Sequence, residues 1–494
     1  MSLPRVAQMA LRPVIAICGT TGVGKSKLGV ELALKLSENI DRHGWTGGVV
    51  VNADAMQAYK GFDTITNKIP PGERAGYVIG QWIHDATRAI SDAHDSKKVP
   101  IIVGGTAYWI QHLIFPGRLA VEPEQVSCPD SSPSASTVSP SDGLLSALSQ
   151  VTVDLRSLFD SLPESPPLAA DDPGAALALH NLLQALDPDV AARWHWRDTR
   201  KVLRNLEIMK NSGRKVSEVL QEQSAASLRP RYDTLFLWLY AEPTELKRRL
   251  DIRADEMLEN GLLDEVRTLT NLASPSDEVG SGSGTTASSI NYTHGVFQSI
   301  GFREFNRYLA DPSPSEIKFQ AAVQNLKTAN HQYAKRQITW IRNKLLSAVR
   351  ASKSTTGVGM YLLDATELQK WSSDVSDVAS NLMEAFLRCD PLPDPPSLSS
   401  AAQRMLSVPA KAAATDPTAA LLAHRKLLCS VCTVNDALPV MIEEGSQWAA
   451  HVKSTAHKRL AAKQAKRKER VHDVLPAATV SSERGRGDNR WRPY

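Results

Sequence analysis

The sequence lacks any long apolar run. Across its 494 residues, no stretch approaches the roughly eighteen apolar residues of a membrane-spanning helix, and no signal-peptide apolar core opens the chain. We therefore expect a soluble protein that has no membrane partner. Cysteine is also scarce, with five residues in the whole chain, which argues against a disulfide-stapled secreted domain and for a reducing compartment.

Acidic residues are missing from the start of the chain. Arg5, Arg12, Lys25 and Lys27 all precede the first carboxylate, which is Glu31. A basic N-terminus without acidic residues is typical of organelle-targeting segments. An untargeted N-terminus is the competing interpretation. We expect a cytoplasmic protein and leave mitochondrial and nuclear fractions open.

Composition suggests several domains. Hydrophobic residues make up 42% of the sequence, enough for a substantial core, and the length suits two or three domains. Three segments rich in Ser, Pro or Gly interrupt the chain, at 121–143, 274–289 and 390–417. The expected parts are a core at 12–118 and 228–350, a helical insertion at 144–227, a linker at 390–420, a C-terminal module with a basic tail at 424–470 and a disordered tail at 471–494.

Short β-rich runs alternate with helical stretches in the expected core. The runs are "VIAICG", "GGVVVNAD", "VPIIVGG" and "TLFLWLYA". This alternation predicts an α/β fold, a P-loop NTPase-like parallel sheet with helices on both faces. Functional groups should then gather at the carboxyl ends of the strands.

The segment "GTTGVGKS", Gly19 to Ser26, fits the phosphate-binding pattern G-x-x-x-x-G-K-[ST] and lies between an expected strand and an expected helix. Its glycines allow backbone N–H groups to converge on an anion, and Lys25 adds a full charge. Ser26 is placed to bind Mg²⁺. A plain glycine-rich turn is the competing interpretation. The loop by itself does not choose among a kinase, an NTPase and a transferase.

Two further residues follow strands. Asp54 comes after "GGVVV", where a carboxylate would hold Mg²⁺ in a nucleotide kinase or act as a base in a transferase. Thr106 closes "VPIIVGGT", where its hydroxyl could bind a ligand. For both residues the competing interpretation is structural, as a turn or helix N-cap.

Two helical runs carry basic residues. Arg200 and Arg204 belong to a set at three- and four-residue spacing, which places them on one helix face that suits a phosphate backbone. In "QYAKRQITWIRNK", Arg336 and other basic residues alternate with Tyr333 and Trp340, a composition that suits nucleic acid. Solvated helix faces have the same pattern, and Trp340 could belong to the core.

Cysteine and histidine are spaced as metal ligands near the C-terminus. Cys429, Cys432, His451 and His457 form a Cys₂His₂ set that suits tetrahedral Zn²⁺, with both histidines on an expected helix. From 451 to 470 the chain has eight Lys or Arg residues against Glu469 alone, so this segment should attract polyanions.

Taken together, these motifs resemble the tRNA dimethylallyltransferase (isopentenyltransferase) family, in its eukaryotic form with a C-terminal zinc finger. The resemblance spans Val14 to Lys344 and Cys429 to Lys458. Its motifs, in the family's order, are "GTTGVGKS", "NADAMQAYKGFDTITNK", "VGGTAYWIQHLIF", "DTRKVLRNLEI", "LDIRADEMLENGLLDEV", "QSIGFREF" and "YAKRQITWIRNK".

The resemblance implies a prenyl transfer. Dimethylallyl diphosphate would donate its allylic group to N6 of the adenosine 3′ to the anticodon, position 37, and pyrophosphate would leave. Asp54 matches the family's base, and Thr106 matches a residue that contacts substrate. Lys25, Arg253 and Mg²⁺ held partly by Ser26 would stabilise the leaving group.

Binding residues follow from the same resemblance. The implied diphosphate-binding residues are Gly19, Thr20, Thr21, Gly22, Gly24, Lys25 and Ser26. The implied tRNA-binding residues are Asp54, Met56, Gln57, Thr106, Arg200, Arg204 and Arg336. The expected partners are the anticodon stem-loop of tRNA and dimethylallyl diphosphate, with structural Zn²⁺ in the finger and one tRNA per monomer.

The sequence departs from the family pattern in one place. After "ITNKIPPGERAG" it continues directly to Tyr77, without a Pro-His-His segment and roughly twenty residues that usually follow there. Ala55 also replaces a usual Ser. Two alternatives therefore stand beside the transferase: a catalytically impaired tRNA-binding relative, and a P-loop nucleoside or small-molecule kinase.

Overall fold

The computed structural model describes residues 11–38, 40–57, 79–117, 140–225, 228–273, 295–356, 359–407 and 424–472. The chain forms two compact units. The first combines Met1–Thr137 with Glu218–Ala420, and the second combines Val138–Ser217 with Leu421–Tyr494.

A parallel sheet of five strands forms the centre of the first unit. Its strands lie in the order β2-β3-β1-β4-β5. Their bounds are β1 Pro13–Gly19, β2 Gly47–Asn52, β3 Lys98–Gly104, β4 Asp233–Tyr240 and β5 Met360–Asp364. Cys18 of β1 lies opposite both Gly104 and Trp238, so three strands end at one edge of the sheet. The predicted α/β fold and its four strands are confirmed.

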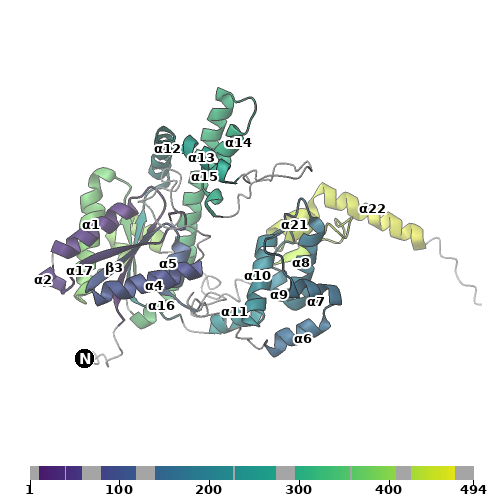
Figure 1. The fold of residues 1–494 in the computed structure, drawn as a ribbon, viewed down its shortest axis with the longest axis horizontal. Coiled ribbons are helices and arrows are strands. Elements are labelled where there is room, and N and C mark those ends of the chain that lie inside the picture. The colour runs from purple at the N-terminus through teal and green to yellow at the C-terminus, as the bar shows by residue number, and fades with distance from the viewer. Residues whose placement is uncertain are drawn as a thin grey trace, which may run out of the picture. The chain divides into compact units, whose positions relative to one another are not determined.

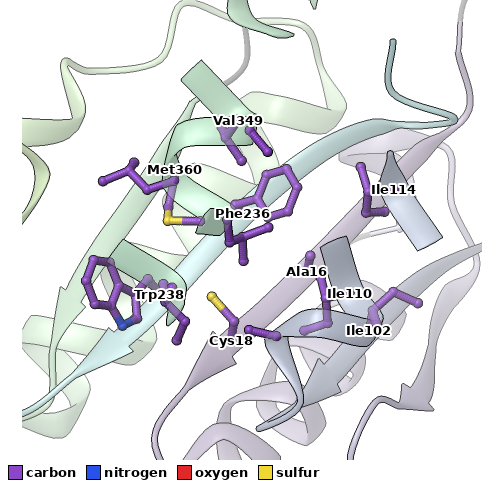
Figure 2. Close-up of a cluster of buried hydrophobic side chains, with 14 of the residues drawn as sticks. Ala16, Cys18, Ile102, Ile110, Ile114, Phe236, Trp238, Val349 and Met360 are labelled. Atoms are coloured by element: carbon purple, nitrogen blue, oxygen red, sulfur yellow. The ribbon is translucent and has the colours of Figure 1, made fainter. Parts of the chain in front are cut away.

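Helices cover both faces of this sheet (Figure 1). Successive residues of β1 serve opposite faces: Ala16 and Cys18 pack in one core and Ile15 and Ile17 in the other. Such a strand is apolar throughout because neither face meets water. The first core, part of which Figure 2 shows, contains residues of α4 Ile79–Asp95, α5 Ala107–Ile114, α16 Leu346–Thr356 and α18 Ser400–Leu406. The second contains residues of α1 Lys25–Glu38, α12 Pro243–Glu259 and α17 Asp377–Leu387.

Two elements differ from the expected organisation. Strand β5 lies beyond residue 350, where the core was expected to end, and pairs with β4. Helix α18 lies within the expected linker at 390–420, and its apolar face, including Met405 and Leu406, is buried against the sheet. The side chain of Ser399 accepts a hydrogen bond from the Ala402 N–H at 3.0 Å and so begins the helix. Part of the expected linker is therefore core.

A third apolar cluster joins the end of α12 to three further helices: α13 Leu262–Ala273, α14 Phe302–Leu309 and α15 Glu316–Trp340. Helix α15 has 25 residues and so measures about 37 Å. Leu326 belongs to this third cluster, whereas Ala334 packs in the core of the sheet. The C-terminal half of α15 is therefore held at the sheet, where it carries Tyr333, Arg336 and Gln337.

Short elements complete the first unit. They are α2 Ile40–His43, the 3₁₀ turns η2 Gly295–Gln298, η4 Leu368–Lys370 and η6 Pro395–Leu398, and the π-helical turns η3 Ile341–Leu345 and η5 Ser372–Ser376. Among the residues that the structure describes, no helix combines the length and apolar character needed to cross a membrane.

The second unit combines the helical insertion with the C-terminal module. Its helices are α6 Asp142–Gln150, α7 Val153–Asp160, α8 Pro173–Leu186, α9 Pro188–Ala191 and α10 Thr199–Ser212, after which α11 Val216–Ala225 leads to the first unit. The module contains β6 Lys426–Leu428, β7 Met441–Glu443, α21 Ser446–Lys453 and α22 Thr455–His472.

Direct contacts attach the module to the insertion. The Trp196 indole N–H donates to the carbonyl of Pro439 at 2.8 Å, and the Lys426 N–H donates to the carbonyl of Ala192 at 2.6 Å. Arg425 also pairs with Asp189 at 3.1 Å. Segments more than two hundred residues apart therefore fold as one unit, although the sequence suggested separate parts.

Strand β5 should contribute to the stability of the first unit. Leu362 is fully buried in β5, so we expect Leu362→Ala to lower the free energy of unfolding by about 2–5 kcal/mol. Leu368 lies shortly after the same strand and is 55% exposed, so Leu368→Ala should change it by less than about 0.5 kcal/mol. Urea denaturation followed by tryptophan fluorescence measures both variants. Equal effects would contradict the placement of β5 in the core.

Candidate active site

The phosphate-binding motif forms a tight turn between β1 and α1. Gly24 has a φ of +88°, and a Cβ there would lie 2.6 Å from the ring of Trp371, so both conformation and space require glycine. Helix α1 begins at Lys25 and has no acidic residue in its first turn. The positive end of the helix dipole therefore faces the turn without a carboxylate to offset it.

Two cations lie beside this turn. The Lys25 ammonium donates to the carbonyl of Thr20 at 2.6 Å, and the Arg253 guanidinium on α12 donates to the hydroxyl of Thr21 at 2.6 Å. Burial lowers the pKa of Lys25 to about 8, an effect that the Asp54 carboxylate opposes and Arg253 reinforces. Burial likewise lowers the pKa of Arg253. The cations are thus partly dehydrated, which strengthens their attraction for an anion.

Asp54 lies in a turn after β2, a position that fits both the functional and the structural interpretation of this residue. Its Oδ1 accepts a hydrogen bond from the N–H of Met56 at 3.0 Å, while its own N–H donates to Oδ1 of Asn52 at 2.7 Å. This is the structural role of a turn aspartate. The residue also lines a cavity, and its Oδ2 lies 3.2 Å from the position that a Cβ of Gly105 would take. One oxygen therefore shapes the turn and the other faces the neighbouring strand end.

Thr106 stands at the N-cap of α5, but its side chain does not cap that helix. Instead its hydroxyl accepts a hydrogen bond from the N–H of Ala55 at 3.0 Å, and its own N–H donates to the carbonyl of Ala53 at 3.2 Å. Thr106 therefore connects the end of β3 to the turn that carries Asp54. It also lines the same cavity.

The cavity has a volume of about 930 Å³ and brings most of the predicted residues together. Its predicted lining residues are Thr21, Gly22, Gly24, Lys25, Ser26, Asp54, Met56, Gln57, Thr106, Arg253 and Arg336. Gly19 and Thr20 are not among the described residues that line it; Thr20 is buried. A second carboxylate, Glu256, contributes to the wall together with Asn330 and Tyr333 of α15.

Two neighbours on α15 are functional candidates: Tyr333, which the sequence analysis named only as part of a composition that suits nucleic acid, and Gln337, which it did not select. The pKa of Tyr333 is raised by burial and also by the Asp54 carboxylate, so its phenol stays protonated. The Gln337 side chain accepts from the N–H of Thr21 at 3.0 Å and donates to the carbonyl of Gly105 at 3.0 Å. Both lie in the basic and aromatic run already noted. A neutral amide has no charge pattern that would single it out there.

The basic face of α10 belongs to the second unit. Arg200 and Arg204 are exposed, whereas Leu203 and Leu206 of the same helix are buried. Arg204 pairs with Glu207 at 3.1 Å. The predicted helix face is therefore present and faces solvent.

The four predicted metal ligands converge in the second unit. Their ligand atoms all lie within 4.8 Å of one another. Nδ1 of His457 is 3.5 Å from each of the Cys429 and Cys432 sulfurs and 3.2 Å from Nε2 of His451. In a tetrahedral zinc site with ordinary bond lengths, these separations would be about 3.6 Å and about 3.3 Å. The donor atoms therefore fit a tetrahedral metal ion.

Comparisons with known proteins agree with this architecture. The family model described as IPP transferase matches residues 57–344, more than half of the chain. The chain belongs to the IPP transferase family. It is 31% identical to the tRNA dimethylallyltransferase of Schizosaccharomyces pombe over 486 residues, covering 93% of this chain and 97% of the relative. For the Saccharomyces cerevisiae enzyme the identity is 32% over 462 residues, with 90% and 91% covered.

A solved structure of a eukaryotic dimethylallyltransferase acting on tRNA is also similar. Its sequence identity is 28% and its TM-score 0.65, and the match covers 94% of this chain and 100% of that one. Family membership decides against the kinase interpretation that the P-loop left open. The departure after Gly76 falls within 58–78, outside the described residues.

Metal should stabilise the C-terminal module. We expect Cys432→Ser to reduce the bound metal from about one ion per chain to well below that, because a tetrahedral site needs all four ligands. Elemental analysis measures the metal. In the variant that has lost its metal, limited proteolysis should cut the chain at positions after residue 424. Cys389→Ser is the control, since Cys389 is an exposed free thiol in the first unit. Unchanged metal content in Cys432→Ser would contradict the assignment.

Proposed function

We propose that this protein is a tRNA dimethylallyltransferase that modifies N6 of the adenosine 3′ to the anticodon. Family membership supports the reaction class. The single observation that supports the assignment of roles is the cavity, which joins the P-loop, Asp54 and Arg253. These residues come from two strand ends, those of β1 and β2, and from helix α12, so the fold itself assembles them.

The P-loop end of the cavity would hold the diphosphate. Four basic side chains and two carboxylates line the cavity, which leaves an excess of positive charge for an anionic ligand. Lys25, Arg253 and the loop N–H groups would stabilise the charge that develops as pyrophosphate leaves. Ser26 offers a hydroxyl oxygen, a ligand type that suits Mg²⁺ beside phosphate oxygens. When bound, that ion would neutralise part of the diphosphate charge.

Next to the P-loop, Asp54 would act on the purine. A bond forms between N6 and the allylic carbon while the bond from that carbon to the diphosphate oxygen breaks, and pyrophosphate leaves with the electron pair. The N6 proton passes to Asp54. The amine is a poor nucleophile because its lone pair is delocalised into the purine, so removing its proton during attack favours the reaction. Thr106 would contribute by fixing the turn that carries Asp54, because its hydroxyl accepts a hydrogen bond from the N–H of Ala55.

The other predicted site residues would bind tRNA. Arg336, Met56 and Gln57 line the cavity and would surround the target nucleotide. The adenosine must leave its stack to enter, which costs least in a single-stranded loop. In the second unit, phosphates would be held by the exposed Arg200 and Arg204 and by a zinc-bound finger whose last helix, the basic α22, carries the ligand His457.

A direct assay tests the proposal. Purified protein is incubated with Mg²⁺, radiolabelled dimethylallyl diphosphate and unmodified tRNA. Label in tRNA, recovered as N6-modified adenosine after digestion, supports the transferase. Binding of tRNA without label transfer would instead support the catalytically impaired relative.

Asp54→Asn tests the base. Asparagine keeps an oxygen for the N–H of Met56, so the turn should persist, but it cannot accept the N6 proton. We expect kcat to fall by about 10²–10⁴-fold with tRNA affinity retained. Asp264→Asn changes an exposed carboxylate on α13 and should leave kcat unaltered. Single-turnover kinetics measure the chemical step, and an Asp54→Asn enzyme of normal rate would refute this role.

Paired substitutions on α10 test the tRNA face. We expect Arg200→Gln with Arg204→Gln to weaken tRNA binding and to lower the slope of log K against log salt by between about one and two. The reason is that each phosphate contact releases counterions. Arg88→Gln, an exposed arginine on α4, is the control. Filter binding over a salt series gives the slopes, and an unchanged slope would remove α10 from the interface.

A further inference from the structure

Gln337 connects three segments that are distant in the sequence. It lies on α15 and is 6% exposed. Its amide oxygen accepts from the N–H of Thr21 in the P-loop, and its amide nitrogen donates to the carbonyl of Gly105 after β3, both at 3.0 Å. The partners are 316 and 232 residues away. A buried amide that satisfies two backbone groups ties those backbones together.

The bond to Thr21 affects the shape of the P-loop. Thr21 is held twice, by Gln337 at its N–H and by Arg253 at its hydroxyl, while Lys25 holds the carbonyl of Thr20. The first half of the loop is therefore fixed without a ligand. The N–H groups of the second half, from Gly22 onward, remain for an anion. Holding donors in place before the ligand arrives reduces the entropy that binding must overcome.

Crowding at Gly105 provides a second, independent view of the same bond. A Cβ there would lie 2.7 Å from the Gln337 amide nitrogen, 3.2 Å from Oδ2 of Asp54 and 3.7 Å from the Lys25 ammonium. Gly105 thus faces three side chains of the site at once. Its lack of a side chain lets Gln337 reach the carbonyl, so an added methyl group would displace the amide.

We propose that Gln337 is a positioning residue that holds the P-loop in its diphosphate-binding shape by joining Thr21 to Gly105. The inference rests on the proposed function for the identity of the diphosphate substrate. Gln337 acts on the reaction through the loop and is not a base, acid or nucleophile. Its loss should therefore weaken binding of the diphosphate end and leave binding of tRNA unaltered.

Gln337→Met tests this directly, because methionine has a similar length but makes neither hydrogen bond. We expect the Kd for pyrophosphate with Mg²⁺, measured by calorimetry, to rise about tenfold, the effect of losing one net hydrogen bond. KM for dimethylallyl diphosphate should rise similarly, with KM for tRNA within about twofold of the original. Gln320→Met is the control, since Gln320 is exposed on the same helix.

Gly105→Ala is the second variant, and it keeps the test decisive if Gln337→Met folds poorly. It should produce the same selective loss of pyrophosphate affinity by displacing the Gln337 amide. Gly80→Ala is its control, because a Cβ at Gly80 would meet nothing within 4 Å. A merely structural role for Gln337 would lower the folded fraction but leave Kd and both KM values unchanged.

That result, in folded Gln337→Met or Gly105→Ala protein, would overturn the inference. Failure of the proposed function looks different. A wild-type protein that transfers no label, combined with weaker pyrophosphate binding in Gln337→Met, would refute the transferase and still support the positioning role.

Discussion

The site depends on one constraint: a glycine turn must pass close to the ends of neighbouring strands while its N–H groups point toward an anion. Gly19 leaves no room for a side chain, because a Cβ there would lie 2.5 Å from the carbonyl of Leu239 on β4. Gly24 is similarly confined by Trp371. The turn thus packs closely against β4 and against the indole of Trp371. Lys25 and Arg253 can then lie partly dehydrated beside it, and this is the condition under which their charges act strongly.

Helix α15 is the second determinant of the site. It is anchored at one end in the helical cluster with α13 and α14 and at the other in the core of the sheet. Because both ends are packed, its inner face is fixed where Tyr333 and Arg336 meet the cavity and Gln337 meets the P-loop. This helix therefore supplies part of the cavity wall beside the strand ends. Sites built on such elements hold their geometry better than sites on loops.

The sequence predicts what local chemistry specifies. The P-loop is visible because its glycines, lysine and serine are contiguous, and the four long strands are visible as apolar runs. Thr106 was ambiguous because the N-cap position and a functional hydroxyl require the same residue at the same place. Strand β5 and helix α18 escaped prediction because a strand of five residues and a helix of seven carry little signal in the sequence, and both are stabilised by packing against β4 and the sheet. Gln337 escaped because its value lies in two partners that are distant along the chain.

Under the proposed function, the two units would divide chemistry from RNA affinity. The cavity holds the charges that act on a diphosphate, whereas the second unit presents α10 and the basic α22. The finger is not an independent appendage, since Trp196 and the backbone of Ala192 bind it to the insertion. Loss of metal would therefore disturb a surface shared with the helical insertion. It would affect tRNA affinity through the geometry of that surface as well as through the basic charges of α22, while the P-loop and Asp54 would keep their own supports in the sheet.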